Sequence, residues 1–177
     1  MANTATTRAE PVEGTIVFTD IVGYTEFTAT RGDADALQLL ATQDRLLDSA
    51  MSDGARVVKE LGDGLLLLFP EPVTALHTAF ALRRGFGDES AASGLAVGIR
   101  VGMHHGTALQ RGEDIIGHDV NVAARIVDIA APGEVLVSDA VRVGVDPDAA
   151  RVRFSELGPV VMKGVPRPVR LWRATAT

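Results

Sequence analysis

Two short apolar runs joined by a glycine-rich turn constrain the fold of this chain more than any other feature. The runs are Arg56–Leu61 and Leu65–Phe69, and the turn between them reads Gly62-Asp63-Gly64. Glycines supply the positive φ angles that tight turns between antiparallel strands require. We therefore predict a β-hairpin of two buried strands, with Asp63 at its tip.

Helical and extended patterns flank this hairpin on both sides. The predicted helices cover residues 33–53, 73–86 and 120–131. The predicted strands outside the hairpin cover residues 15–19, 95–105, 107–109, 135–138, 152–154, 160–162 and 169–172, with 107–109 as an antiparallel continuation of 95–105. In the first helix, the buried stripe is expected to consist of Leu37, Leu40, Leu47, Ala50 and Met51.

A hairpin set between helices and outer strands is the split βαβ pattern of ferredoxin-like sheets. We therefore predict an α+β fold, a ferredoxin-like (palm-like) βααββαβ sandwich with extra C-terminal strands. In such a layout the first strand can lie beside the central hairpin. Asp20 and Asp63 would then meet at one edge of the sheet, although they are far apart in the sequence.

The length of the chain fits a single domain. Its 177 residues, 46% of them hydrophobic, are enough to form one full-sized core. Residues 1–13 are polar and contain no apolar stretch, so we predict a flexible N-terminal tail rather than a signal peptide. The domain itself is predicted to cover residues 14–177.

The composition excludes several classes of partner and site. The net charge is −6 and no basic run occurs, which argues against a nucleic-acid partner. The chain has no cysteine, which excludes disulfides and zinc–thiolate sites and is typical of a cytoplasmic protein. Its longest uninterrupted apolar run, Leu65–Phe69, is far shorter than the ~20 residues of a membrane helix, so we expect no membrane partner.

Asp20 and Asp63 each follow an apolar strand and stand near a glycine. Either aspartate alone is more typical of a turn or a cap. As a pair at one sheet edge, they predict ligands for divalent metal ions, because Mg²⁺ is usually held by one or two carboxylates together with substrate phosphates. Two-metal sites of this kind carry out phosphoryl transfer.

The turn that follows Asp20 is a candidate phosphate site. Gly23 would allow a close approach of the backbone, and the first amides of the next helix would donate to phosphate oxygens. An ordinary strand-to-helix turn has the same sequence pattern, and the GxxxxGK[ST] motif of a Walker loop is absent. The residues assigned to this candidate site are Val22, Gly23, Tyr24, Thr25 and Phe27.

Lys59 and Asp114 form a second candidate constellation. A lysine within an apolar strand needs a partner, because an unpaired buried ammonium is costly. Lysine can donate to N1 of adenine and a carboxylate can accept from its N6 amino group, whereas guanine presents the reverse pattern. The alternative is a surface lysine paired with Glu60 or Glu71.

A third group of polar residues lies in the second half of the chain. Asn121 and Arg125 are spaced i, i+4 on an otherwise apolar helix, where they could hold a ribose oxygen and a phosphate, or simply face solvent. Lys163 and Arg167 belong to a turn from which they could reach phosphates, although basic turn residues are usually just solvated.

These motifs together resemble the class III adenylate/guanylate cyclase catalytic domain, most closely the single-domain mycobacterial adenylate cyclases. The resemblance spans residues 14–172 and rests on FTDIVGYT, VVKELGDG, RVGMHHG and DIIGHDVNVAAR. It implies that Asp20 and Asp63 hold two divalent metal ions, Mg²⁺ or Mn²⁺, with help from the Ile21 carbonyl. It also implies that Lys59 and Asp114 select adenine.

The same resemblance implies that Asn121 and Arg125 stabilise the transition state. The substrate would be ATP, and the products 3′,5′-cyclic AMP and pyrophosphate. The partner would be a second copy of the chain in a head-to-tail homodimer with two composite active sites. Val165 departs from the family, which often has a triphosphate-binding lysine there, so Arg167 or Lys163 is expected to substitute.

Two other functions remain open on the sequence alone. One is a guanylate cyclase or a cyclase of mixed specificity, against which Lys59 and Asp114 argue. The other is a non-catalytic nucleotide-binding module that regulates a partner through its dimer state. A diguanylate-cyclase-type enzyme comes last, because no GGDEF-like stretch occurs.

Overall fold

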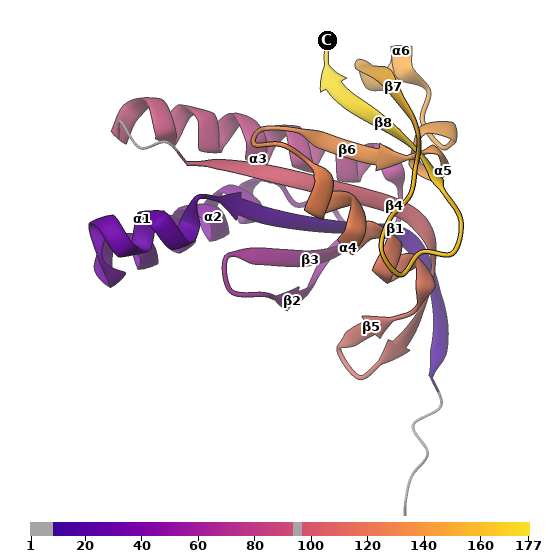
Figure 1. Cartoon of the computed structure of the whole chain (residues 1–177), viewed down its shortest axis with the longest axis horizontal. Helices are drawn as coiled ribbons and strands as arrows, with labels where there is room; N and C mark the ends of the chain where they lie inside the picture. The colour runs from indigo at the N-terminus through magenta and orange to yellow at the C-terminus, as the bar shows by residue number, and fades with distance from the viewer. Residues whose placement is uncertain (1–8, 94–96) are drawn as a thin grey trace, which may run out of the picture.

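In residues 9–93 and 97–177, the parts that the computed structural model describes, eight strands form one sheet with helices packed against it (Figure 1). The order of elements confirms the predicted βααββαβ arrangement with further strands after it. The elements are β1 (Glu10–Val22), α1 (Tyr24–Arg31), α2 (Asp33–Ala50), β2 (Arg56–Glu60), β3 (Gly64–Phe69), α3 (Pro72–Ser93), β4 (Gly98–Arg111), β5 (Asp114–Ile116), α4 (His118–Ile129), β6 (Val135–Ser138), α5 (Asp139–Val143), α6 (Pro147–Ala150), β7 (Val152–Val160) and β8 (Val169–Ala176).

The strand order is β2-β3-β1-β4-β6-β8-β7, and β5 pairs with β4 outside this row. Strand β1 therefore lies between β3 and β4 and is antiparallel to both. It begins at Glu10 and pairs with β4 along its whole length, so residues 10–13, predicted to be part of the tail, belong to the sheet. Residues 1–8 of that predicted tail lie outside the described residues.

Helices cover both faces of the central strands. Alternate residues of a strand point to opposite faces, and Val17 and Ile21 of β1 accordingly pack in the cluster that includes α2 and α3. Ile16 packs in the opposite cluster, together with Val120 and Ala123 of α4. All six residues of β3 are buried, because both of its faces are covered.

The hairpin of β2 and β3 forms where the sequence predicts it, but only β3 is buried, because β2 is an edge strand with no buried residue. The stripe predicted for the first helix is also partly wrong. Leu47 is buried, but Leu37 is 67% exposed. The buried positions of α2 instead include Ala36, Leu39 and Gln43, which follow helical spacing with Leu47. Both stripes satisfy the helical period, and only the position of the sheet selects between them.

The predicted reversal after residue 105 is also wrong. Residues 98–111 form one uninterrupted strand, β4, and the chain turns back only at Gly112, where φ is 64° and β5 begins two residues later. Gly106 serves a different purpose, because a Cβ there would lie 2.1 Å from Oδ2 of Asp119. This glycine admits a side chain of α4 and makes no turn.

Toward the C-terminus, two predicted strands merge and two helices appear. Residues 152–160 form the single strand β7, and the short helices α5 and α6 were not predicted. Residues 94–96, which include the start predicted for the fourth strand, lie outside the described residues. None of the described helices is long and apolar enough to cross a membrane.

Candidate active site

The structure brings Asp20 and Asp63 to the same edge of the sheet. Asp20, near the end of β1, pairs with Gly64, the residue that directly follows Asp63. A Cβ at position 64 would lie 2.6 Å from the Thr19 carbonyl oxygen, so glycine allows the two strands to approach here. Burial raises the pKa of Asp63, and the negative charge of Asp20 raises it further.

Arg100 completes this corner of the site, and the sequence reasoning missed it. It lies opposite Asp20 on β4, and its Nε donates a 2.7 Å hydrogen bond to Oδ2 of Asp20. Both side chains are about one-third exposed (29% and 31%), so solvent can reach the pair. An arginine within an apolar strand was a signal of the same kind as Lys59.

A cavity of about 220 Å³ opens beside this pair, and α4 forms its other side. Arg125 lines the cavity together with Asp20 and Arg100. Its Nη1 donates to Oδ2 of Asp128, one helical turn away, at 2.6 Å, and both side chains are about half exposed. An exposed ion pair of this kind contributes about 0.2–1 kcal/mol, so Arg125 can exchange it for a phosphate at little cost.

The turn after β1 has the geometry expected of a phosphate site, with one exception. Gly23 has a φ of 81° and precedes α1, whose first turn has no side-chain cap. The amides of Tyr24 and Thr25 therefore remain available to a ligand. Phe27 does not fit, because its side chain is buried and its amide donates to the Gly23 carbonyl at 2.8 Å.

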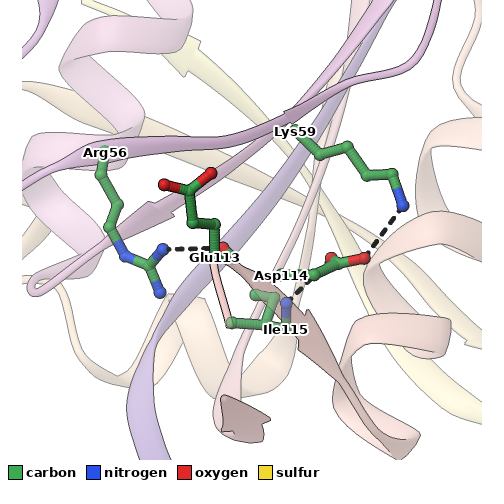
Figure 2. A network of polar contacts seen from close by, with 5 residues as sticks. All are labelled: Arg56, Lys59, Glu113, Asp114 and Ile115. Carbon is green, nitrogen blue, oxygen red and sulfur yellow. Dashed lines mark hydrogen bonds and ion pairs between the residues drawn. The ribbon is translucent and has the colours of Figure 1, made fainter. Parts of the chain in front are cut away.

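Lys59 and Asp114 meet across the space between β2 and β5 (Figure 2). The Lys59 Nζ donates to Oδ2 of Asp114 at 2.9 Å, so the partner of this lysine is neither Glu60 nor Glu71. This hydrogen bond holds the pKa of Asp114 below its usual value. At neutral pH the Asp114 carboxylate can therefore only accept hydrogen bonds.

Asn121 and Arg125 are both exposed and lie one turn apart on α4, as their spacing predicts. The opposite side of α4 is buried against β4, where Gly102 allows contact so close that a Cβ would lie 2.2 Å from the Val127 nitrogen. The absence of one side chain on β4 therefore determines how near this helix comes to the sheet.

The basic turn between β7 and β8 is held against α4. Val165 is 8% exposed and packs with Val122 and Ile126, so this position supplies a core contact rather than a cation. Lys163 and Arg167 are exposed, and neither lines the cavity beside Asp20. The structure thus does not bring Arg167 together with the other candidate residues.

The donor set at the sheet edge fits hard divalent cations. Among the described residues, no group of three or more histidine, aspartate or glutamate side chains could hold a metal by itself. Two carboxylates at one edge of a sheet suit Mg²⁺, which takes its remaining ligands from water and substrate phosphates.

Comparison with known proteins identifies the family. The sequence model of the adenylate and guanylate cyclase catalytic domain matches residues 7–173. The pH-sensitive adenylate cyclase MT1302 of Mycobacterium tuberculosis (strain CDC 1551 / Oshkosh) is 31% identical over 161 residues, which cover 90% of this chain and 40% of that protein. Putative adenylate cyclase 3 of Rhizobium meliloti (strain 1021) is 31% identical over 160 residues, which cover 89% of this chain and 27% of that protein.

Solved structures agree with this assignment. The adenylyl cyclase CyaB from P. aeruginosa has the same fold, with a TM-score of 0.84 over 96% of both chains at 21% identity. The adenylate/guanylate cyclase/hydrolase from Silicibacter pomeroyi gives a TM-score of 0.79 at 29% identity, over 94% of this chain and 98% of that chain. This chain therefore belongs to the adenylate and guanylate cyclase catalytic domain family.

Proposed function

We infer that this chain is an adenylate cyclase, which converts ATP to 3′,5′-cyclic AMP and pyrophosphate in a homodimer. The observation that carries the choice of ATP is the 2.9 Å contact between Lys59 and Asp114. It places one donor and one obligate acceptor side by side, and adenine presents the complementary acceptor at N1 and donor at its N6 amino group. Guanine would place its O6 and N1–H against the wrong partners.

The base must displace the resting ion pair to use these groups. The Lys59 and Asp114 side chains are 51% and 37% exposed, so separating them costs only about 0.2–1 kcal/mol. A charged group left without its partner in a bound complex costs more, about 1.5–3 kcal/mol per hydrogen bond. The pair can therefore open for adenine and still discriminate against guanine.

Divalent metal ions bound at Asp20 and Asp63 would lower the pKa of the ribose 3′-hydroxyl and neutralise phosphate charge. The ribose 3′-hydroxyl would give its proton to water, its oxygen would bond to the α-phosphorus as the bond to the oxygen shared with the β-phosphate breaks, and pyrophosphate would leave. Arg125 is suited to bind the α-phosphate and Asn121 the ribose, because both are exposed on one face of α4. The α1 amides and Arg100 are suited to the remaining phosphates.

The size of the cavity supports a shared site. About 220 Å³ is below the 300–1,000 Å³ typical of small-molecule sites, and Lys59, Asp114 and Asn121 do not line it. One copy of the chain therefore holds two separate sets of groups, and neither makes a complete site. The first set lines the cavity and includes Asp20, Arg100 and Arg125; the second lies outside it and consists of Lys59, Asp114 and Asn121. A second copy in a two-fold arrangement would complete two equivalent sites.

The decisive experiment is product analysis with ATP or GTP, in Mg²⁺ or Mn²⁺, over a range of protein concentrations. We expect cyclic AMP, with a specific activity that rises with protein concentration as dimers form. Asn121→Ala and Arg125→Ala should each lower kcat by about 10²–10³, whereas Arg153→Ala, an exposed arginine of β7, should not. Cyclic GMP as the main product, or no cyclic product from folded dimer, would contradict the proposal.

A further inference from the structure

A bulge in β2 turns Arg56 and Lys59 toward the same side of the sheet. Residues three apart on a regular strand point to opposite faces. Here Arg56 pairs with Leu68 and Lys59 with Leu66, which are two apart on β3, and the register shifts between Val57 and Lys59. The extra residue, Val58, therefore brings the two basic side chains onto one face.

From this face Arg56 forms hydrogen bonds with the β4–β5 hairpin, which carries Asp114 (Figure 2). Its Nη1 donates to the Glu113 carbonyl at 3.2 Å, and its Nη2 donates to Oε1 of Gln110 at 2.5 Å. Gln110 in turn donates through Nε2 to the Gly112 carbonyl. Arg56 thus contacts the end of β4 through the Gln110 side chain and the turn that leads into β5 through the Glu113 carbonyl. The Gln110 side chain adds a second contact to that turn at Gly112.

The direction of the Asp114 carboxylate depends on this turn. Asp114 is the first residue of β5, and its Oδ1 accepts from the Ile115 amide at 2.9 Å, while its Oδ2 accepts from Lys59. One carboxylate oxygen is therefore tied to the backbone of β5. A shift of the Gly112–Glu113 turn would move the carboxylate relative to β2, and hence relative to Lys59.

We propose that Arg56 is a positioning residue for base selection, which fixes the turn that carries Asp114 relative to β2 so that Lys59 and Asp114 can both reach the edge of an adenine base. This inference rests on the proposed function. The inference adds to the proposed function one residue, Arg56, that is not expected to touch the nucleotide. The guanidinium makes its contacts to Glu113 and Gln110 from two separate nitrogens, which a single lysine ammonium would reproduce only in part.

The test compares ATP with purine riboside 5′-triphosphate, which lacks the N6 amino group and so cannot donate to Asp114. In the wild type, kcat/KM should favour ATP by about 10- to 100-fold, the value of one hydrogen bond to a charged group. In Arg56→Ala the preference should fall to about threefold or less, mainly through lost activity on ATP. Arg56→Lys should retain an intermediate preference, and Gln110→Ala should change it in the same direction by less.

The matched control is Arg153→Ala, which removes an exposed arginine from β7 at the opposite edge of the sheet and should leave the ATP preference unchanged. Circular dichroism and the thermal midpoint establish that each variant is folded. An unchanged ATP preference in folded Arg56→Ala, or an equal loss of activity on both substrates, would overturn the role of Arg56. A wild type that forms no cyclic product from ATP or GTP would instead contradict the proposed function.

Discussion

Arg100 and Asp20 face each other on neighbouring strands, and the arginine Nε donates a 2.7 Å hydrogen bond to the aspartate Oδ2. The same guanidinium reaches the Asp128 carbonyl at the edge of α4, at 3.4 Å. One side chain therefore connects the strand that carries a proposed metal ligand with the helix that carries Arg125.

The first prediction concerns this arginine. Arg100→Ala should lower kcat/KM for ATP about 100-fold, because it removes a preorganised positive charge from a cavity where phosphate charge develops. Arg100→Lys should recover part of the loss, and steady-state kinetics across a Mn²⁺ titration would measure both. If Arg100 served only to neutralise Asp20, the alanine variant would recover wild-type activity at saturating Mn²⁺.

The second prediction follows from the incomplete cavity of one chain. Asp20→Ala and Asn121→Ala, which change one residue inside and one outside that cavity, should each be nearly inactive alone, and an equimolar mixture should regain about a quarter of wild-type activity. Half of the randomly formed dimers would be mixed, and each mixed dimer would have one intact site out of two. The cyclic AMP assay on the mixture measures this, and tagged, co-purified heterodimers should show about half of wild-type activity. No activity in those heterodimers would argue against a head-to-tail arrangement.

The third prediction concerns the contact between β4 and α4. Gly102→Ala should destabilise the protein by about 2–3 kcal/mol, because its Cβ would lie 2.2 Å from the Val127 nitrogen and the backbone of α4 would have to move. Gly98→Ala, on the same strand, has no atom of the described residues within 4 Å of its Cβ and should change the free energy of unfolding by less than about 0.5 kcal/mol. Urea unfolding measures both, and equal effects would contradict this account of the packing.

The fourth prediction concerns the pH dependence of stability. Burial lowers the pKa of His104, with the nearby Asp119 opposing the shift, and its Nδ1 lies 2.8 Å from the Ser138 hydroxyl. Below the unfolded-state pKa of about 6.5, the unfolded chain takes up a proton that folded His104 does not. Stability should therefore be complete above that pH and fall as pH drops toward the folded pKa, by at most about 1.4 kcal/mol per pH unit.

The measurement is urea unfolding between pH 7.5 and 5, with His104→Gln as the comparison. Glutamine keeps a polar group beside Ser138 but does not titrate, so the variant should lose this part of the pH dependence. His105 provides a control, because it lies beside Thr15 and Glu13 instead. A wild type and a His104→Gln variant with the same slope against pH would exclude His104 as the source.

Several site residues could be predicted because their signals are local. Asp63 lies in a glycine turn between two apolar runs, and the antiparallel pairing of β1 with β3 then brings Asp20 beside it. Asn121 and Arg125 share a helix face because their spacing requires it. Arg100 was missed although it too interrupts an apolar strand, since its significance depends on which residue lies opposite it on β1.

The order of the central elements, the hairpin and the family followed from the sequence by itself, because strand and helix periods and turn glycines are properties of neighbouring residues. The tertiary structure decided which stripe of α2 is buried, that β4 continues past Gly106, and that Arg56 shares a face with Lys59. Each of these depends on a partner distant in the chain: the sheet under the helix, the Asp119 side chain, and the register of β3 against a bulge. Local patterns permit several such arrangements, and only packing against the partner selects one.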